Sequence, residues 1–458
     1  MMAASRYHNF RRDPPEGLED NQREDFFIVD EDGERLYEAE FGGLFLTMVK
    51  HNDVAMIKRY LTKYTWPIWP GVVVTDNAFW NAVHYGSSDA LHMLLEHEGA
   101  YPSQPPSYKA QMTMLNEACF SARIDMVLYL LDSQAAFASI QERDGDCRMN
   151  ALLSAACSLT DMADMYNHEP RSEFVTRREK LMALLLDRGA CARDVLLRPH
   201  LGEQPEDTVL TLAISRASAK MVKRLLSEGA DMHTKTMHFG FPNFEEEFIT
   251  DATALHFGSQ YCNIDGIRVL IEQSDNAADM VACRDSFGRL PLHYAAAGRC
   301  PILASGRVIE DETQLYIRPT MDLLLDVCPA TINVQDKKGD TALHHAVKRH
   351  RQCGGGHVNT IVETLCGRGA DASICNDNGE TPLHLLSFHV LDGDPIETSL
   401  VDLLLAHGGN LNAVDADGNT PLHWAARNLR HLETTRHLLS RGADSAAGDD
   451  ESSTGGWG

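Results

Sequence analysis

The chain has 458 residues, of which 43% are hydrophobic, and its formal net charge is −25. This hydrophobic content suffices for a folded core, whereas the excess of acidic residues argues against binding nucleic acid through its phosphates. No run of apolar residues approaches the ~18 that would span a bilayer, so we expect neither a nucleic-acid nor a membrane partner.

The N-terminal segment is the most acidic part of the chain. Residues 13–40 contain twelve acidic and only two basic side chains. Segments with high net charge and few apolar residues do not bury enough surface to fold, so residues 1–40 are predicted to be disordered. The end of this segment, FFIVDEDGERLYEAEF, has enough apolar residues to fold as an N-terminal cap on the rest of the chain.

A short phrase recurs in the second half of the chain. Its copies are TALHF at 253–257, LPLHYAA at 290–296, TALHHA at 341–346, TPLHLL at 381–386 and TPLHWAA at 420–426. Thr420 is placed to cap a short helix, Pro421 suits the first helical position, and His423 can hydrogen-bond back to the cap. An apolar helical stripe follows each copy, and several of these stripes end at a glycine suited to the left-handed position after a helix.

Weaker copies precede these five. They are NAFWNAV from 77, TMLNEAC from 113, NALLSAA from 150 and TVLTLAI from 208, with a most diverged copy near 44. Recurrence indicates an architectural unit, and the phrase resembles the ankyrin repeat, whose signature is T-P-L-H-x-A with a period near 33 residues. The resemblance implies an all-α fold, an ankyrin-type helix-turn-helix solenoid with short hairpin loops, over residues 41–445. The ten predicted units are 41–74, 75–110, 111–146, 147–205, 206–250, 251–284, 285–335, 336–375, 376–414 and 415–445, and residues 446–458 form a tail predicted to be disordered.

The cysteines and the N-terminus bear on the compartment. The eleven cysteines are scattered without a C-x-x-C pair, the first residues lack an apolar leader, and no N-x-S/T acceptor occurs. These features favour reduced thiols. We therefore expect an intracellular protein, cytoplasmic or nuclear or both. Separately, we expect the protein to be a monomer.

The sequence offers no basis for catalysis, a cofactor or a metal. No G-x-S-x-G, H-E-x-x-H, dinucleotide or kinase signature occurs. The five histidines of the repeated phrase lie one repeat apart, so they are not expected to converge on one zinc ion. A C-x-x-x-H spacing at Cys353 and His357 has no second half nearby, and its glycines read more simply as a flexible insertion. We therefore predict a protein that is not an enzyme and holds no cofactor.

By the same resemblance, the function is protein–protein recognition by a scaffold or adaptor, on the concave surface formed by the hairpin tips and inner helices. The candidate contacts are the variable residues around each turn glycine, where the alternative is an ordinary solvated turn. They are Phe287, Arg289, Lys337, Lys338, Asp340, Asn378, Glu380, Asp417 and Asn419. An aromatic insertion supplies four further candidates, which could instead fold back over the solenoid. They are Phe239, Phe241, Phe244 and Phe248.

Two other functions stay open at this point. The array could be the substrate-recruiting subunit of a ubiquitin ligase or another enzyme complex, with a recruitment module in residues 1–43. It could also regulate a transcription factor by masking, because an acidic array is able to cover a basic DNA-binding region.

Overall fold

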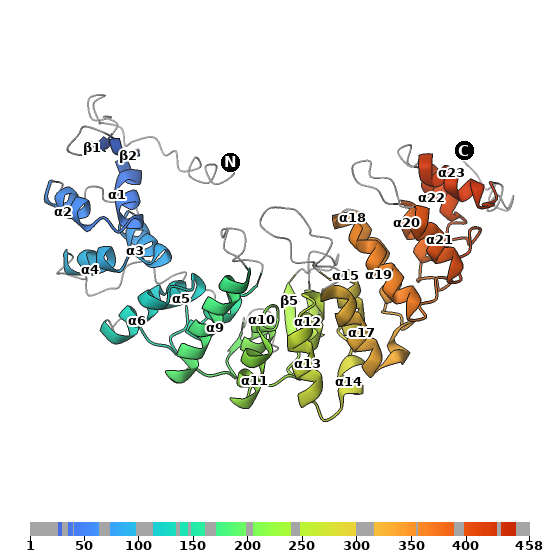
Figure 1. Ribbon diagram of the computed structural model, residues 1–458, viewed down its shortest axis with the longest axis horizontal. Coiled ribbons are helices and arrows are strands. Elements are labelled where there is room, and N and C mark those ends of the chain that lie inside the picture. The colour runs from blue at the N-terminus through green and yellow to red at the C-terminus, as the bar shows by residue number, and fades with distance from the viewer. Residues whose placement is uncertain are drawn as a thin grey trace, which may run out of the picture. The chain divides into compact units, whose positions relative to one another are not determined.

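The structure is a computed structural model. It describes residues 26–29, 35–39, 41–63, 74–97, 113–133, 138–144, 148–160, 171–197, 205–239, 248–298, 316–353, 356–388, 398–427 and 432–445. Ten pairs of helices lie among these residues, one pair for each predicted unit, although the third helix begins at Val74, one residue before its predicted unit (Figure 1). No helix in the described ranges combines the length and the apolar character needed to cross a membrane.

The chain divides into two compact units. The first comprises residues 1–109 and 125–133, and the second comprises residues 110–124 and 134–458. The described elements of the first unit are β1 (Phe26–Val29), β2 (Arg35–Ala39), α1 (Phe41–Lys50), α2 (Val54–Lys63), α3 (Val74–Tyr85), α4 (Ser88–His97) and most of α6 (Ile124–Ser133).

In the first unit, α1 packs against α2 and α3, and α4 packs against α2 and α3. Its core includes Phe45, Met48, Ile57, Phe79 and Leu91, each at most 3% exposed. The turn between α1 and α2 is tied to α4, because the Asn52 side chain accepts from the Ala90 N–H at 2.8 Å.

The predicted disorder of residues 1–40 is wrong at its C-terminal end. Strands β1 and β2 pair antiparallel, with Phe26 opposite Ala39 and Ile28 opposite Tyr37. Both strands lie against α1, as expected for an N-terminal cap. The strand sequences FFIV and RLYEA contain aromatic and β-branched residues, which are the residue types that strands favour. Residues 1–25 and the tail at 446–458 lie outside the described residues.

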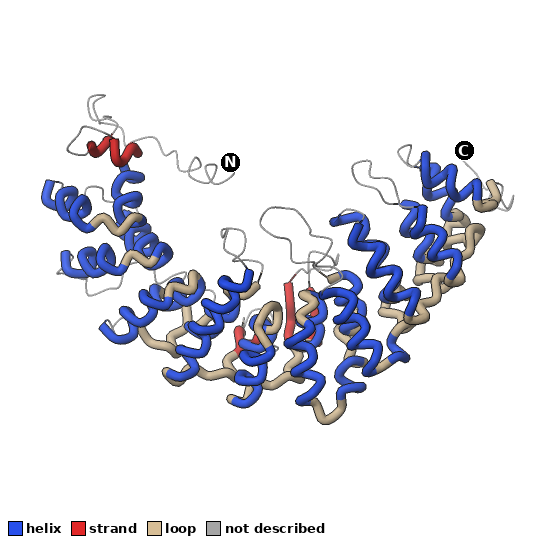
Figure 2. The backbone as a smooth tube through the Cα atoms, viewed as in Figure 1, coloured by secondary structure: helices blue, strands red, loops and turns tan. Residues whose placement is uncertain are grey.

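The second unit contains the remaining elements, shown as blue helices and red strands in Figure 2. They are α5 (Met114–Phe120), α7 (Ala151–Cys157), α9 (Arg171–Asp187), β3 (Val195–Leu196), β4 (Asp207–Thr208), α10 (Val209–Ala213), α11 (Ala219–Ser227), β5 (Thr236–Phe239), β6 (Phe248–Ala252), α12 (Ala254–Gln260), α13 (Ile264–Gln273), α14 (Ala277–Val281), α15 (Pro291–Ala297), α17 (Arg318–Val327), η5 (Pro329–Thr331), α18 (Ala342–Cys353), α19 (Gly356–Gly367), α20 (Pro382–Phe388), α21 (Thr398–Ala406), α22 (Pro421–Arg427) and α23 (Leu432–Ser440).

Helices of the same kind stack on one another in this unit. The first helices of the repeats contact in the order α5, α7, α10, α12, α15, α18, α20 and α22. From α11 onward the second helices contact in the order α11, α13, α17, α19, α21 and α23. The core therefore grows along one axis, as in a solenoid. Short α14 and η5, which the sequence pattern did not predict, follow the second helices of their repeats.

The turn glycines have the predicted role. Gly369, after α19, has a φ of +94°, in the left-handed region. Gly339, in the turn before α18, has a φ of +77°, and a Cβ there would lie 2.7 Å from the Asp377 backbone nitrogen of the next turn. Both positions need glycine, the first for its φ and the second also for the close approach of two turns.

Candidate functional site

Four consecutive turns of the second unit share one hydrogen-bonded frame. In the turn before α15, Asp285 Oδ1 accepts from the backbone N–H groups of Phe287 and Arg289, both at 2.8 Å. Asp336, Asn376 and Asp415 do the same in the next three turns. This Asx-type bonding fixes each turn by its first residue, and the two residues after it form the tip of the turn.

Neighbouring turns are also bonded to one another. The Lys337 N–H donates to the carbonyl of Phe287 at 2.8 Å. The same bond joins Asp377 to Lys338 at 3.0 Å and Ala416 to Asn378 at 2.8 Å. Strand β6 extends the series, because the Ser286 N–H donates to the Thr250 carbonyl at 2.8 Å. The tips therefore form a continuous backbone ribbon, which we call the tip ribbon, comprising Thr250, 286–287, 337–338, 377–378 and 416–417.

The repeated histidine connects each turn to the next. Nδ1 of His344 accepts from the Thr341 N–H at 3.1 Å, and Nε2 lies 3.1 Å from the Glu380 carbonyl of the following turn. A backbone N–H only donates, so Nδ1 has no proton and Nε2 carries it. His256, His293 and His384 make the equivalent bonds. The predicted bond from this histidine back to the cap is confirmed, and its bond to the next turn is new.

Burial keeps these histidines neutral. It lowers the pKa of His293 to about 3 and that of His344 to about 4. Burial also lowers the pKa of His256 and of His384. A proton on Nδ1 would face a backbone N–H, so the bonding pattern opposes protonation for the same reason.

A second contact joins each turn to its own helix. The residue nine positions after the turn carboxylate donates to Oδ2: Tyr294 to Asp285 at 2.8 Å, His345 to Asp336 at 2.9 Å, and Trp424 to Asp415 at 2.7 Å. The corresponding residue in the remaining turn is Leu385, which has no donor. In that turn the first residue is Asn376 in place of an aspartate.

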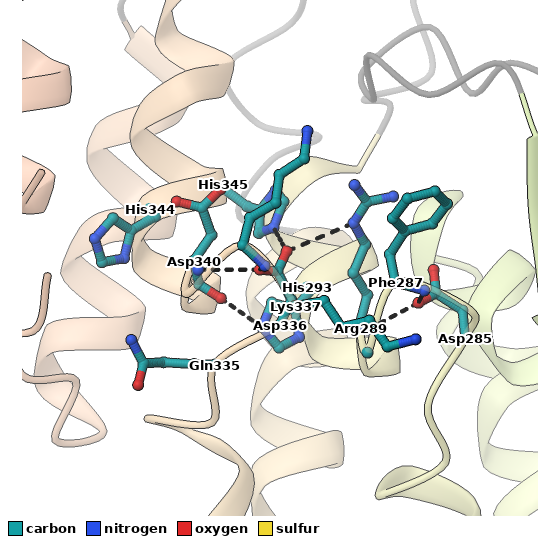
Figure 3. Close-up of polar contacts among 12 residues, drawn as sticks. Asp285, Phe287, Arg289, His293, Gln335, Asp336, Lys337, Asp340, His344 and His345 are labelled. Atoms are coloured by element: carbon teal, nitrogen blue, oxygen red, sulfur yellow. Dashed lines mark hydrogen bonds and ion pairs between the residues drawn. The ribbon is translucent and has the colours of Figure 1, made fainter. Parts of the chain in front are cut away.

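The junction between the turns of α15 and α18 brings several buried charged side chains together (Figure 3). The Arg289 side chain is 2% exposed, its Nε lies 3.6 Å from Asp336 Oδ2, and its guanidinium lies 5.0 Å from the centre of the Phe287 ring. Burial opposes ionisation of Asp336, yet hydrogen bonds from His345 and the Lys338 N–H hold its pKa below the ordinary value. The Asp336 carboxylate is therefore charged. It accepts from backbone N–H groups of its own turn and faces Arg289 of the preceding turn.

At the next junction, between the turns of α18 and α20, the fifth residue of the first turn is acidic and the first residue of the second turn is a neutral amide. Asp340 accepts from Lys348 Nζ, and its Oδ1 accepts from Asn376 Nδ2 at 3.0 Å. The same Asn376 amide donates to Glu380 at 2.8 Å. An aspartate at 376 would lie beside the carboxylate of Asp340, whereas asparagine donates to it. The charge of the fifth residue in one turn thus matches the first residue of the next turn: a carboxylate faces Arg289, and an amide donor faces Asp340.

This arrangement predicts that a substitution toward the commoner turn residue is harmful. Asn376→Asp should lower the free energy of unfolding by about 2 kcal/mol, because it removes two donated hydrogen bonds and adds a like charge beside a buried carboxylate. Urea denaturation monitored by circular dichroism measures the loss. Asp377→Asn, at the exposed neighbouring position, is the matched control and should stay within about 0.5 kcal/mol of the parent. Equal stability of the two variants would contradict the charge argument.

Asp336, Asp340 and His345 place ligand-type atoms within 4.8 Å of one another. Their oxygens are already used: both oxygens of Asp340 accept from side chains, and both of Asp336 accept from backbone or His345 donors. Arg289 and Lys348 also place two positive charges beside them. A cation would have to displace these donors, so the chemistry of the cluster fits an internal ion network rather than a metal site.

The structure separates the predicted turn residues into three groups. Lys337, Lys338, Asn378 and Asp417 are exposed, whereas Phe287, Glu380 and Asn419 are half-buried. Arg289 and Asp340 are buried, at 2% and 1% exposure, which corrects the expectation that they project from the tips. Both occupy the fifth position of their turn, where the side chain contacts the first residue of the next turn. Sequence reasoning also left out the exposed first tip residues Asp377 and Ala416.

The predicted aromatic insertion begins and ends in a β-hairpin. Phe239 closes β5 opposite Phe248, the first residue of β6. Phe248 is 42% exposed. Phe241 and Phe244 lie outside the described residues. The insertion is thus anchored to the tip ribbon through β6, whose Thr250 bonds Ser286.

A family model agrees with this geometry. The model described as "Ankyrin repeats (3 copies)" matches residues 316–389 and 350–449, which include the turns of Asp336, Asn376 and Asp415. The chain is an ankyrin-repeat protein. The stacked helix pairs place the remaining repeats in the same fold, as the sequence resemblance implied.

Relatives share the repeats over part of their length. The chain is 27% identical over 187 residues to neurogenic locus notch homolog protein 1 of Xenopus laevis. The match covers 37% of this chain and 6% of that protein. It is 26% identical over 246 residues to human Inversin, which covers 47% of this chain and 20% of that protein. A solved ankyrin repeat domain from Acinetobacter baumannii is 26% identical and covers 51% of this chain and 98% of its own, with a TM-score of 0.36. Ankyrin repeats generally mediate protein–protein interactions and are typically non-enzymatic.

Proposed function

We propose that this ankyrin-repeat protein is a non-enzymatic, intracellular scaffold or adaptor that binds a protein partner along the tip ribbon. One observation carries the proposal. Each turn has the same buried frame, but the exposed tips differ: Lys337 and Lys338 in one turn, Asp377 and Asn378 in the next, Ala416 and Asp417 in the last. A fixed backbone with variable side chains suits recognition of one particular partner.

The exposed tip residues carry both signs of charge, which favours a partner surface that also carries both signs. The two lysines of one turn precede an acidic residue in each of the following two turns. Lys337 Nζ donates to the Ser286 carbonyl at 2.7 Å, so this side chain extends along the ribbon. Complementary charges across an interface give specificity and speed association more than they add affinity.

Neither alternative gains support from an observation of this structure. A ubiquitin-ligase subunit was expected to carry a recruitment module within residues 1–43, but the part of this segment described before α1, residues 26–29 and 35–39, pairs as two β-strands. A masking role rests on the net charge of −25 alone, which is not confined to the tips. The scaffold proposal uses the geometry and is therefore preferred.

Reversing the tip charge tests the proposal. Lys337→Glu combined with Lys338→Glu should weaken partner binding by roughly tenfold or more, because like charges then meet across the interface. Partners are first identified by affinity purification and mass spectrometry with the parent chain. Binding of each purified partner to the variant is then measured by biolayer interferometry.

The matched control is Lys220→Glu combined with Lys223→Glu, which reverses the same charge on two exposed lysines of α11. This variant should bind as the parent does. Equal binding by the tip variant and the parent would place the interface elsewhere, with the hairpin of β5 and β6 tested next through Phe248→Ser.

A further inference from the structure

The cap of α5 is joined to the next turn without the repeated histidine. Asn116 stands three residues after the cap residue Thr113, as His344 does after Thr341. The Asn116 Nδ2 group donates to the Met149 carbonyl of the next turn at 2.9 Å, and this is the bond that Nε2 of the histidine makes in the later repeats. An amide therefore supplies half of what the histidine does elsewhere.

Asp144 supplies the other half. In the later repeats Nδ1 of the histidine accepts from the N–H of the cap residue. Here Asp144 Oδ1 accepts from the Thr113 N–H at 2.6 Å and from Asn116 Nδ2 at 2.7 Å. The turn before α7 is one residue longer than the turn before α15, because the Asp144 N–H bonds the fifth residue on, Met149, whereas the Asp285 N–H bonds the fourth. The carboxyl group of Asp144 thus bonds the preceding repeat.

One oxygen atom of each side chain is left over. Within the described part of the chain, Asp144 Oδ2 and Asn116 Oδ1 are buried and have no hydrogen-bond partner. The two residues are 3% and 0% exposed. Both atoms only accept when the carboxyl group is ionised, so neither satisfies the other. A protonated carboxyl group has a donor on Oδ2, and with an amide it forms two bonds, N–H to O and O–H to O.

The cations of this turn are directed elsewhere. Arg143 places Nη2 3.3 Å from Asp194 Oδ1, and its Nη1 donates to the carbonyls of Arg148 and Val195. Arg148 is exposed. Helix α7 carries no acidic, basic or histidine side chain. Among the described residues, no cation forms an ion pair with Asp144, so an ionised carboxylate there would be a buried charge without a counterion.

The acidic groups nearby also oppose ionisation of Asp144. Burial raises the pKa of Asp144 to about 6, although its two hydrogen bonds lower it, and the negative charge of Glu142 raises it further. On α5, Glu117 adds a second acidic group, which accepts from Ser121 Oγ at 2.8 Å. Asp146 lies outside the described residues. Geometry and charge therefore favour the neutral form of Asp144.

We propose that Asp144 is a proton-binding site that joins the repeats of α5 and α7. A proton from solvent binds Oδ2 and is donated to Asn116 Oδ1, so the two side chains pair through two hydrogen bonds. In an unfolded chain an aspartate binds its proton only near pH 3.9. The stabilisation is therefore complete below about pH 4 and is lost as the pH rises through about 6. A buried histidine responds in the opposite direction.

Hydrogen exchange of the full chain at pH 7.5 and 5.0, with each rate corrected for the intrinsic effect of pH, tests the proposal. In Asp144→Asn the new amide donates to Asn116 Oδ1 at every pH. At pH 7.5 this variant should protect the amides of α5 and α7 more strongly than the parent does. The ratio of the two protections should shrink by roughly tenfold at pH 5.0, because the parent then binds its proton. The ratio cancels contributions from the histidines, which both chains share.

Glu142→Gln is the matched control, because it removes the same charge two residues away. Its protection relative to the parent should be about the same at both pH values. The proposal is overturned if Asp144→Asn protects α5 and α7 no better than the parent at pH 7.5, or if the ratio is the same at pH 5.0. If this variant does not fold, the parent decides: acid must raise the protection of α5 and α7 relative to that of α15 and α18, and a parallel fall overturns the proposal.

Discussion

Asp336→Ala is expected to lower the free energy of unfolding by about 3–5 kcal/mol, because it removes one partner of a buried charge pair. The Asp336 side chain is 1% exposed. It accepts from two backbone N–H groups of its own turn and from His345, and it faces the Arg289 guanidinium. Without it, a buried cation and several donors lose their acceptor. Urea denaturation monitored by circular dichroism measures this loss as a shift of the midpoint.

The control is Asp417→Ala, an exposed aspartate two residues after the equivalent turn position of the last repeat, which should change stability by less than about 0.5 kcal/mol. A repeat array need not unfold in one step, so hydrogen exchange should accompany the denaturation. Faster exchange should be concentrated in residues 285–350. A small loss, or one spread evenly over the second unit, would show that Arg289 and Asp336 do not hold these repeats together.

Much of the fold follows from the repeated letters themselves. The roles of Thr341 and His344 depend on residues three positions apart in one helix turn, a relation that can be read from the sequence. The same holds for Gly369, whose place at the end of a helical stripe predicts its left-handed φ. These features are local, so no knowledge of neighbouring repeats is needed.

The contacts between repeats could not be predicted in this way. Arg289 and Asp340 stand beside a turn glycine, and polarity alone suggests that they face solvent. They are buried because the next turn lies directly on them and supplies Asp336 and Asn376 as partners. The nine-residue spacing from Asp336 to His345 also joins a turn to a helix. Neither relation has a periodicity within one element, so both needed the stacked structure.

Mild acid is expected to destabilise the second unit through its buried histidines. In an unfolded chain a histidine has a pKa near 6.5, whereas in the folded chain burial lowers the pKa of His293 to about 3 and that of His344 to about 4. The pKa values of His256 and His384 are lowered for the same reason. Between these limits the unfolded state binds more protons than the folded state. The stabilisation is therefore complete above about pH 6.5 and is lost as the pH falls toward 4.

Each such histidine contributes a slope of up to about 1.4 kcal/mol per pH unit in this window. One opposing group is Asp144, whose pKa burial raises to about 6, so its protonation favours the folded state over part of the same range. Four histidines outweigh one carboxyl group, and the net change is a loss. Urea midpoints at pH 7.5, 6.5, 5.5 and 4.5 should fall steadily below about pH 6.5.

A single substitution identifies the source of this pH dependence. His344→Gln removes one of the four titrating groups, so it should lower stability at pH 7.5 but also reduce the dependence on pH by about one proton. His233→Gln, at an exposed position, should leave both quantities unchanged. If His344→Gln keeps the same pH dependence of stability as the parent, the loss of stability in acid comes from groups other than this buried histidine.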